Sequence, residues 1–201
     1  MKFSLYSNFF KPVGDKIVAF ILLVLLFPIF ILVSILILID SKGPVFFLQE
    51  RLGKDGMVFK LIKFRSMTHR ERSYTKQTLI SDPEVTNVGV LIRRLKIDEL
   101  PQLINVLIGQ MSIVGPRPSL PNLREKFNED ADYRIQVKPG VTNLAAVNGS
   151  IYLTWPERWV YDRYYVENLT FGLDLFIIMK TILVVFLGEK FFYKGNGNKT
   201  Y

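Results

Sequence analysis

The stretch that decides the fold is IVAFILLVLLFPIFILVSILILI, residues 17–39, in which only Pro28 and Ser34 interrupt the apolar side chains. A run of about 20 apolar residues is long enough for a membrane helix, and this run is too long for a buried strand. A cleaved signal peptide has a shorter core, and residues 40–44 (DSKGP) offer no small-residue cleavage site. The sequence therefore predicts a membrane segment that stays in the mature protein.

Two features of this segment indicate how it meets the membrane. Three lysines precede it and six Lys or Arg residues follow it within residues 42–65, so the charge rule favours neither end as the outer one. Pro28 divides it into arms of about 11 residues, each roughly 16 Å long, which is half the hydrocarbon thickness. A re-entrant helix-break-helix that enters and leaves by one face explains both features. A single tilted spanning helix with a tolerated proline remains the alternative.

Composition limits the chemistry. The chain has 201 residues, a formal charge of +8, a pI near 9.6 and a mean hydropathy of +0.23. Residues 1–97 hold 15 Lys and Arg against 7 Asp and Glu, whereas residues 98–201 hold 11 of each. This combination points to a membrane surface or to polyanionic ligands. No cysteine and a lone His69 exclude thiol chemistry and leave no histidine cluster for a metal. Catalysis would have to use carboxylates, basic groups and hydroxyls.

The pattern after the apolar segment predicts a small domain of helices and strands. Two β-prone runs at residues 45–52 and 57–64 flank an Asp-Gly turn and predict a β-hairpin. Lys63 and Arg65 share one face of the second run and, from the pattern alone, are expected to contact solvent or headgroups. Helices are expected over residues 88–95, 98–108, 121–134, 155–168 and 173–187, after a polar surface loop over residues 67–83 that holds His69. The last helix is short for a span and is predicted to be interfacial.

Adjacent carboxylates at Asp98 and Glu99 form the most concentrated acid-base group, and they follow Arg93, Arg94 and Lys96. Neighbouring side chains on a helix point about 100° apart, so the two acids would have different roles. A helix N-terminus would favour the ionised form of both. Ionised carboxylates attack phosphorus or bind Mg²⁺, and arginines hold phosphate oxygens. Plain helix capping is the alternative.

Arg117 lies between Pro116 and Pro118. Two prolines restrict the backbone, which lowers the entropy lost when the arginine fixes a ligand. The alternative is a surface turn without a ligand. The aromatic residues of 155–168 are expected to be core or membrane-interface residues.

Taken in order, these pieces resemble the bacterial sugar transferase family, the monotopic polyprenyl-phosphate phosphoglycosyl transferases, in its minimal form. The resemblance covers nearly the whole chain. Its markers are Pro28, residues 43–47 (GPVFF), Gln49, Arg51, Gly53, residues 63–67 (KFRSM), Asp82-Pro83, Arg93, residues 98–106 (DELPQLINV), residues 111–118 (MSIVGPRP), residues 138–142 (KPGVT) and residues 164–168 (YYVEN).

The resemblance implies an α+β protein, with a re-entrant membrane helix over residues 1–40 and a cytoplasmic-face catalytic domain over residues 41–201. It implies transfer of a sugar 1-phosphate from a UDP-sugar to undecaprenyl phosphate at the bacterial inner membrane, with release of UMP, as the first step of glycan synthesis. Membrane lipids would be partners, nucleic acid would not, and a homodimer is left open.

The same resemblance implies roles for individual residues. Asp98 would be the nucleophile that forms a phosphosugar-aspartyl intermediate, and Glu99 would bind the required Mg²⁺. The remaining implied contacts are to substrate: Arg93 and Arg117 on phosphates, Lys63 assisting them, and Asp162 on the nucleotide side.

This chain departs from the family pattern in three places. Phe27 precedes the central proline where serine is common, residues 143–146 read NLAA where the family often has GWAQ, and Ser150 stands where an arginine is common. The altered loop would suit a different donor or a weakened enzyme. Three hypotheses follow: the transferase, a membrane-anchored scaffold or nucleic-acid-binding protein that holds polyanions, and a transferase-like protein without activity.

Overall fold

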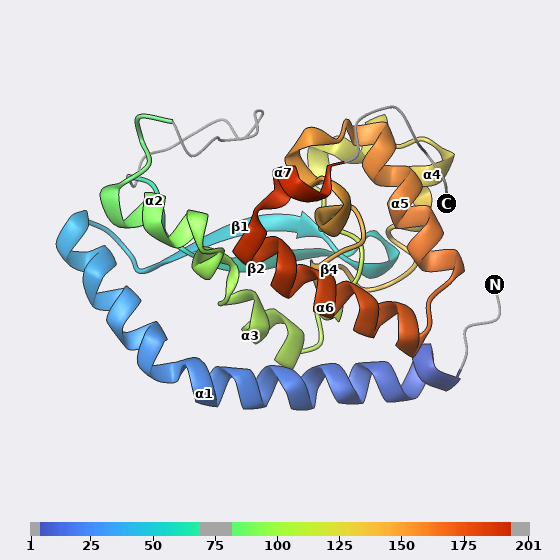
Figure 1. Cartoon of the computed structure of the whole chain (residues 1–201), viewed down its shortest axis with the longest axis horizontal. Helices are drawn as coiled ribbons and strands as arrows, with labels where there is room; N and C mark the ends of the chain where they lie inside the picture. The colour runs from blue at the N-terminus through green and yellow to red at the C-terminus, as the bar shows by residue number, and fades with distance from the viewer. Residues whose placement is uncertain (1–4, 69–81, 194–201) are drawn as a thin grey trace.

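The computed structural model describes residues 5–68 and 82–193, so His69 and most of the loop expected over 67–83 lie outside the described residues. Figure 1 shows one long helix, α1 (Lys11–Asp40), running beneath a small domain of short helices and strands. A π-helical turn, Tyr6–Phe10, precedes α1. The expected combination of an apolar N-terminal helix with a mixed helix and sheet domain is confirmed.

Helix α1 is continuous across Pro28, so the expected break is a bend within one helix. Figure 1 shows the bend in the second half of α1. Proline has no backbone N–H, so the carbonyl of Val24 loses its helical partner and the helix bends there. Ser34 Oγ donates to the carbonyl of Phe30 (2.6 Å), a contact that also bends helices. Over Tyr6–Asp40 the chain is long and apolar enough to cross a membrane, judged by length and composition.

One side of α1 packs on the domain and the other is exposed. Ala19, Val33 and Ile37 are at most 5% exposed, whereas residues such as Leu25 and Phe27 are more than 60% exposed. Ala19 joins a core cluster with Phe59, Leu61, Leu103, Val106 and Met111. An apolar surface of this extent is not stable in water and indicates contact with a membrane.

The predicted hairpin is confirmed. Strands β1 (Phe46–Leu52) and β2 (Val58–Phe64) pair antiparallel, with Phe47 opposite Lys63. Asp55 and Gly56 both have positive φ (57° and 76°), the geometry that an Asp-Gly turn favours.

A second sheet carries the arginine turn. Strand β3 (Ser112–Val114) pairs parallel with β4 (Gly140–Thr142). A Cβ atom at Gly140 would lie 2.1 Å from the backbone nitrogen of Gly115, so only glycine allows the two chains to approach this closely. The turn at Pro116–Pro118 therefore has a rigid base.

The helices agree with the sequence in part. Helices α2 (Asn87–Arg94), α5 (Trp155–Glu167) and α6 (Phe171–Leu187) confirm three expectations. The helix predicted over 121–134 is wrong, because extended residues separate a 3₁₀ turn, Pro121–Lys126, from the short α4 (Glu129–Tyr133), which Asn128 caps. The remaining short helices are α3 (Gln102–Leu107) and α7 (Glu189–Phe192).

Candidate active site

The carboxylates Asp98 and Glu99 lie on a 3₁₀ turn, Ile97–Glu99, between α2 and α3. Lys96 begins this turn in the left-handed conformation (φ 58°), which reverses the chain after α2. The predicted helix start at Asp98 is therefore wrong, since α3 begins only at Gln102. The turn presents the two acids separately: Asp98 is 9% exposed, and its Oδ1 is buried without a partner in the described structure.

Glu99 is held by two cations from different parts of the chain. Lys63 Nζ on β2 lies 2.7 Å from Glu99 Oε1, and Arg117 Nη2 lies 3.1 Å from the same oxygen. Burial disfavours the charged form of Glu99, but Lys63 and Arg117 outweigh it and hold the pKa of Glu99 well below its usual range. The tertiary structure thus brings together Lys63, Glu99 and Arg117, three of the residues to which the family resemblance gave roles. The expectation from the pattern alone that Lys63 contacts solvent or headgroups is wrong, because its ammonium pairs with Glu99.

Asp98 has the opposite electrostatic character. Burial and the neighbouring Glu99 raise the pKa of Asp98, although Lys63, Arg93 and Lys96 partly oppose them. The expectation that a helix terminus favours the ionised form of both acids is therefore wrong for Asp98. The adjacent acids differ in the way that separate catalytic roles require.

Arg93 lies on the last turn of α2, where its Nε donates to Ser66 Oγ at 2.8 Å. A Cβ atom at Gly89 would lie 2.0 Å from the carbonyl oxygen of Ser66, so α2 packs tightly on this segment. The positive charge of the Arg93 guanidinium lowers the pKa of Asp98 and so partly offsets the effect of burial. Arg65, expected on the face of Lys63, is instead buried and donates to the carbonyl of Ser41 (2.6 Å) at the end of α1.

Sequence reasoning gave Arg51 no role in this site. Its guanidinium donates to the Pro118 carbonyl (3.1 Å) and to Gln49 Oε1 (2.6 Å), and burial and Arg117 lower the pKa of Arg51 to about 10. Arg51 and Lys63 then line one small cavity with Arg117. Arg51 is a marker of the family resemblance, but its spacing along the chain does not place it at the carboxylates. Hydrogen bonds from the end of β1 to the backbone carbonyls of Pro118 and Ser119 bring it there.

Asp162 is not brought to the carboxylates. Its side chain is 2% exposed and lies 3.1 Å from Arg134 Nη2, which donates to the backbone carbonyl of Arg117 at 2.7 Å. Burial raises the pKa of Asp162 to about 6 even though Arg134 and Arg158 attract its charge. Asp162 therefore lies behind the arginine turn, where it supports Arg117 through Arg134.

Asn105 ties the carboxylate segment to the hairpin. Its side chain has no exposed surface, accepts a hydrogen bond from the Ile62 N–H (3.0 Å) and donates to the Lys60 carbonyl (2.8 Å). A third bond joins it to Gln110. These bonds fix α3 against β2 and so set the distance between Lys63 and the carboxylates.

The donor set at this site matches Mg²⁺ bound together with a substrate phosphate. Mg²⁺ takes one or two carboxylates plus phosphate and water oxygens. Both cation contacts of Glu99 use Oε1, and Asp98 Oδ1 is an orphaned buried oxygen. Among the described residues, no group of three or more acidic or histidine side chains forms an all-protein metal site.

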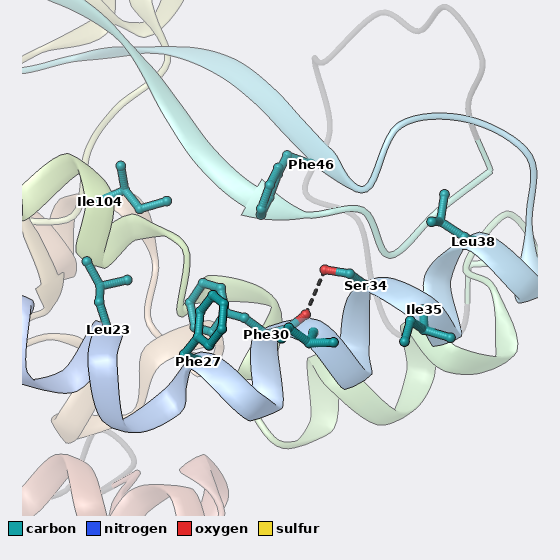
Figure 2. Close-up of a pocket in the computed structure, with 9 residues that line it drawn as sticks. Leu23, Phe27, Phe30, Ser34, Ile35, Leu38, Phe46 and Ile104 are labelled. Atoms are coloured by element: carbon teal, nitrogen blue, oxygen red, sulfur yellow. Dashed lines mark hydrogen bonds between the residues drawn. The ribbon is translucent and has the colours of Figure 1, made fainter.

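An apolar groove of about 450 Å³ opens beside the bend of α1. Figure 2 shows Leu23, Phe27 and Phe30 on α1 facing Ile104 of α3 and Phe46 of β1 across it. Ser34 is the polar residue in its lining, and its hydroxyl is already bonded to the helix backbone. The groove matches a hydrocarbon chain in character.

A carboxylate and arginine site next to an exposed apolar helix indicates a membrane-anchored protein whose site has the charges to bind anionic groups. Comparison with known proteins agrees, because the profile of the family described as bacterial sugar transferase matches residues 6–188. The chain belongs to this bacterial sugar transferase family.

Individual relatives cover the chain to different extents. The exopolysaccharide production protein ExoY of Sinorhizobium fredii is 35% identical over 89% of this chain and 89% of its own length. The uncharacterized sugar transferase EpsL of Bacillus subtilis is 44% identical over 73% of this chain and 72% of its own. The UDP-glucose:undecaprenyl-phosphate glucose-1-phosphate transferase of Klebsiella pneumoniae is 39% identical over 90% of this chain, which spans 41% of that protein.

Proposed function

We propose that this chain transfers a sugar 1-phosphate from a UDP-sugar to undecaprenyl phosphate and releases UMP. Its family makes it a transferase of phosphorus-containing groups. Relatives are named for glucose, galactose and N-acetylgalactosamine transfer to undecaprenyl phosphate, so their names support the acceptor and leave the sugar open. The observation that carries the proposal is the buried, unpartnered Oδ1 of Asp98 beside the cation-bound Glu99.

In the first half-reaction, an Asp98 oxygen attacks the phosphorus that bears the sugar. A bond forms between this oxygen and phosphorus, the bond from phosphorus to the UMP oxygen breaks, and UMP leaves with that electron pair. Its raised pKa makes Asp98 a more basic carboxylate than an exposed one, and a more basic oxygen is a stronger nucleophile once ionised. Arg117 and Arg51 neutralise the charge that develops on the phosphate oxygens.

In the second half-reaction, a phosphate oxygen of the acceptor attacks the same phosphorus. The bond to Asp98 breaks, the carboxylate is regenerated, and the product is a sugar joined to the lipid through a diphosphate. The two halves use one site in turn, so ping-pong kinetics are expected. Arg93, which lies on the Asp98 side of the site, would hold the acceptor phosphate.

We assign Mg²⁺ to Glu99, whose Oε2 takes no part in the Lys63 and Arg117 contacts. The ion would supply charge neutralisation on the donor diphosphate. Lys63 and Arg117 keep Glu99 ionised and therefore able to bind a cation. Addition of EDTA is expected to stop UMP release, and excess Mg²⁺ is expected to restore it.

The polyprenyl chain of the acceptor would lie in the apolar groove beside the bend. Phe46 on its wall stacks on Phe64, the residue after Lys63, with ring centroids 5.5 Å apart. Ile104, also on its wall, lies on α3, which begins three residues after Glu99, so a chain in this groove would have its phosphate toward the carboxylate turn. The groove opens along α1, from which a membrane lipid can enter.

The bend also supports a re-entrant helix with both ends on the cytoplasmic face. Thirty helical residues span about 45 Å, and a straight spanning helix would place its ends on opposite faces. Here both ends of α1 bond to the same domain: Lys11 binds Asp174, and Arg65 binds the carbonyls of Ile37 and Ser41.

The decisive experiment measures UMP release from purified protein given undecaprenyl phosphate, Mg²⁺ and a panel of UDP-sugars. We expect Asp98→Asn to lower the rate by at least about 10³-fold, as for other covalent nucleophiles. Asp55→Asn is the matched control, because Asp55 lies in the exposed hairpin turn and asparagine accepts its positive φ. No UMP with any donor would favour an inactive, polyanion-binding relative, and undiminished release from Asp98→Asn would exclude the aspartyl mechanism.

Topology is tested separately with single cysteines in this cysteine-free chain. Ser7→Cys and Lys42→Cys flank the apolar segment, and a membrane-impermeant thiol reagent should label both from the same side. Labelling from opposite sides would establish a spanning helix instead.

A further inference from the structure

A buried polar cluster joins the first turns of α1 to helices α5 and α6 of the domain. Asp174 on α6 is 4% exposed, and its Oδ2 accepts hydrogen bonds from Tyr6 Oη (2.6 Å) and Lys11 Nζ (2.7 Å). Its Oδ1 accepts one from Tyr165 Oη on α5 (2.7 Å). Figure 1 shows the beginnings of α1 and α6 meeting at this point.

A second contact extends the cluster to the arginine turn. Asp15, one helical turn after Lys11, accepts a hydrogen bond from Ser112 Oγ on β3 at 2.5 Å. Tyr165 Oη also lies 3.0 Å from the carbonyl of Val114 on the same strand. Strand β3 leads directly into the Pro116–Pro118 turn, so α1 is tied to the strand that carries Arg117.

The apolar side chains of α1 do little to fix how the helix is rotated against the domain. Its side chains are apolar on nearly every side, and hydrophobic contacts are non-directional, so apart from the close packing of Ala19 they select one rotation of the helix less strongly than polar contacts do. Buried ion pairs contribute little net stability, because desolvation offsets their attraction, and their best-attested use is to fix register. Hydrogen bonds and ion pairs are directional, so a charged cluster at one end of an apolar helix can fix the rotation of that helix, which its apolar contacts leave less well defined.

Because of the bend at Pro28, the arm of α1 before Pro28 needs this polar cluster more than the arm after it does. Arg65 binds the carbonyls of Ile37 and Ser41 and so fixes the arm after Pro28. Leu23 and Phe27 lie on the arm before Pro28, yet they line the same groove as Phe30. A rotation of the first arm by a single residue, about 100°, would turn both out of the groove.

We infer that Asp174 is a positioning residue that, by binding Tyr6, Lys11 and Tyr165, sets the rotation of the first arm of α1 and so completes the apolar groove. The inference concerns the geometry of the helix and does not require that the groove be occupied. If the proposed transfer reaction is right, Asp174 affects use of the lipid acceptor and not of the nucleotide donor.

Spin labels test the geometry directly, and the absence of native cysteine allows two unique sites. Leu25→Cys places one label on the first arm, where Leu25 is 67% exposed, and Glu125→Cys places the other on the exposed surface of the domain. In lipid nanodiscs we expect one narrow distance distribution for the otherwise unchanged protein. Adding Asp174→Asn should broaden or split it.

Two further variants complete the series. Tyr6→Phe removes one hydroxyl and keeps the Lys11–Asp174 pair, so the chain folds and a smaller broadening is expected. Glu167→Gln breaks an exposed pair with Arg163 and should leave the distribution unchanged. A distribution for Asp174→Asn as narrow as that of the parent, at the same mean distance, would overturn the inference.

A kinetic measurement separates positioning from general destabilisation. Asp174→Asn should raise KM for undecaprenyl phosphate about tenfold, the scale of one charge-assisted hydrogen bond, with the burst of UMP from donor alone unchanged. Equal losses in both half-reactions would contradict the positioning role. If no donor supports turnover, the proposed function fails, while the label distances still decide this inference.

Discussion

Lys63 Nζ and Glu99 Oε1 lie 2.7 Å apart, although 36 residues separate them in the chain. Burial lowers the pKa of Lys63, and Glu99 opposes this, so each charge depends on the other in a poorly solvated place. The pair connects the hairpin to the carboxylate turn.

Replacing Lys63 with methionine should lower turnover by roughly 10²-fold, as does removal of one preorganised charge from other active sites. Without Lys63, less positive charge holds Glu99 ionised, so Mg²⁺ binding should also weaken. The measurement is UMP release as a function of Mg²⁺ concentration. Lys60→Met is the control, because Lys60 lies on the same strand with an exposed side chain. Equal losses in both variants would contradict the assignment.

The rate of the first half-reaction should fall on acidification at a pH above the ordinary 3.8 of an aspartate. The nucleophile must be ionised, and burial and Glu99 raise the pKa of Asp98. Lys96 partly opposes this rise in the pKa of Asp98. Lys96→Gln should therefore move the acid limb of the pH–rate profile, where the rate falls on acidification, to higher pH. The shift should shrink in high salt, since Lys96 is exposed.

Arg94→Gln is the matched control for that profile. It removes a neighbouring exposed charge that is not among the main influences on the pKa of Asp98. A limb that moves equally in both variants would show that net charge, and not Lys96, sets the pKa.

Asp162 should make the fold less stable as pH rises from about 4 to about 6. Its pKa is about 6 in the folded protein and 3.8 in an exposed aspartate, so the folded state binds the proton more tightly and this contribution is lost as the group ionises. Two pKa units correspond to about 3 kcal/mol. Thermal unfolding across this pH range should therefore show a shallower decline for Asp162→Asn. Asp132→Asn, at an exposed pair with Arg124, should retain the decline of the unchanged protein.

Asn105→Ala should destabilise the protein by about 2–4 kcal/mol, because it leaves the Ile62 N–H and the Lys60 carbonyl buried without partners. The free energy of unfolding in detergent gives the measure. Asn168→Ala removes an exposed amide from the end of α5 and should cost far less. Similar losses would show that Asn105 does not join the hairpin to α3 in solution.

The two carboxylates differ most between their local sequence pattern and their place in the fold. Local pattern identified Asp98 and Glu99 as a pair but placed them on a helix start, where both would ionise easily. The turn at Lys96 instead buries Asp98 and aims Glu99 at two cations. Burial and charge partners come from distant segments, so spacing along the chain does not reveal which acid has the raised pKa.

The apolar run at residues 17–39, the hairpin and the residue types available for chemistry follow from the sequence by itself, because hydrophobic length, period-two alternation and an Asp-Gly turn are local properties. Only the tertiary structure shows that Arg51 lines the site and that Asp162 lies behind Arg117. It also shows that Lys11 binds Asp174. Each of these depends on side chains that meet across different elements, where packing and desolvation, rather than local preference, decide the free energy.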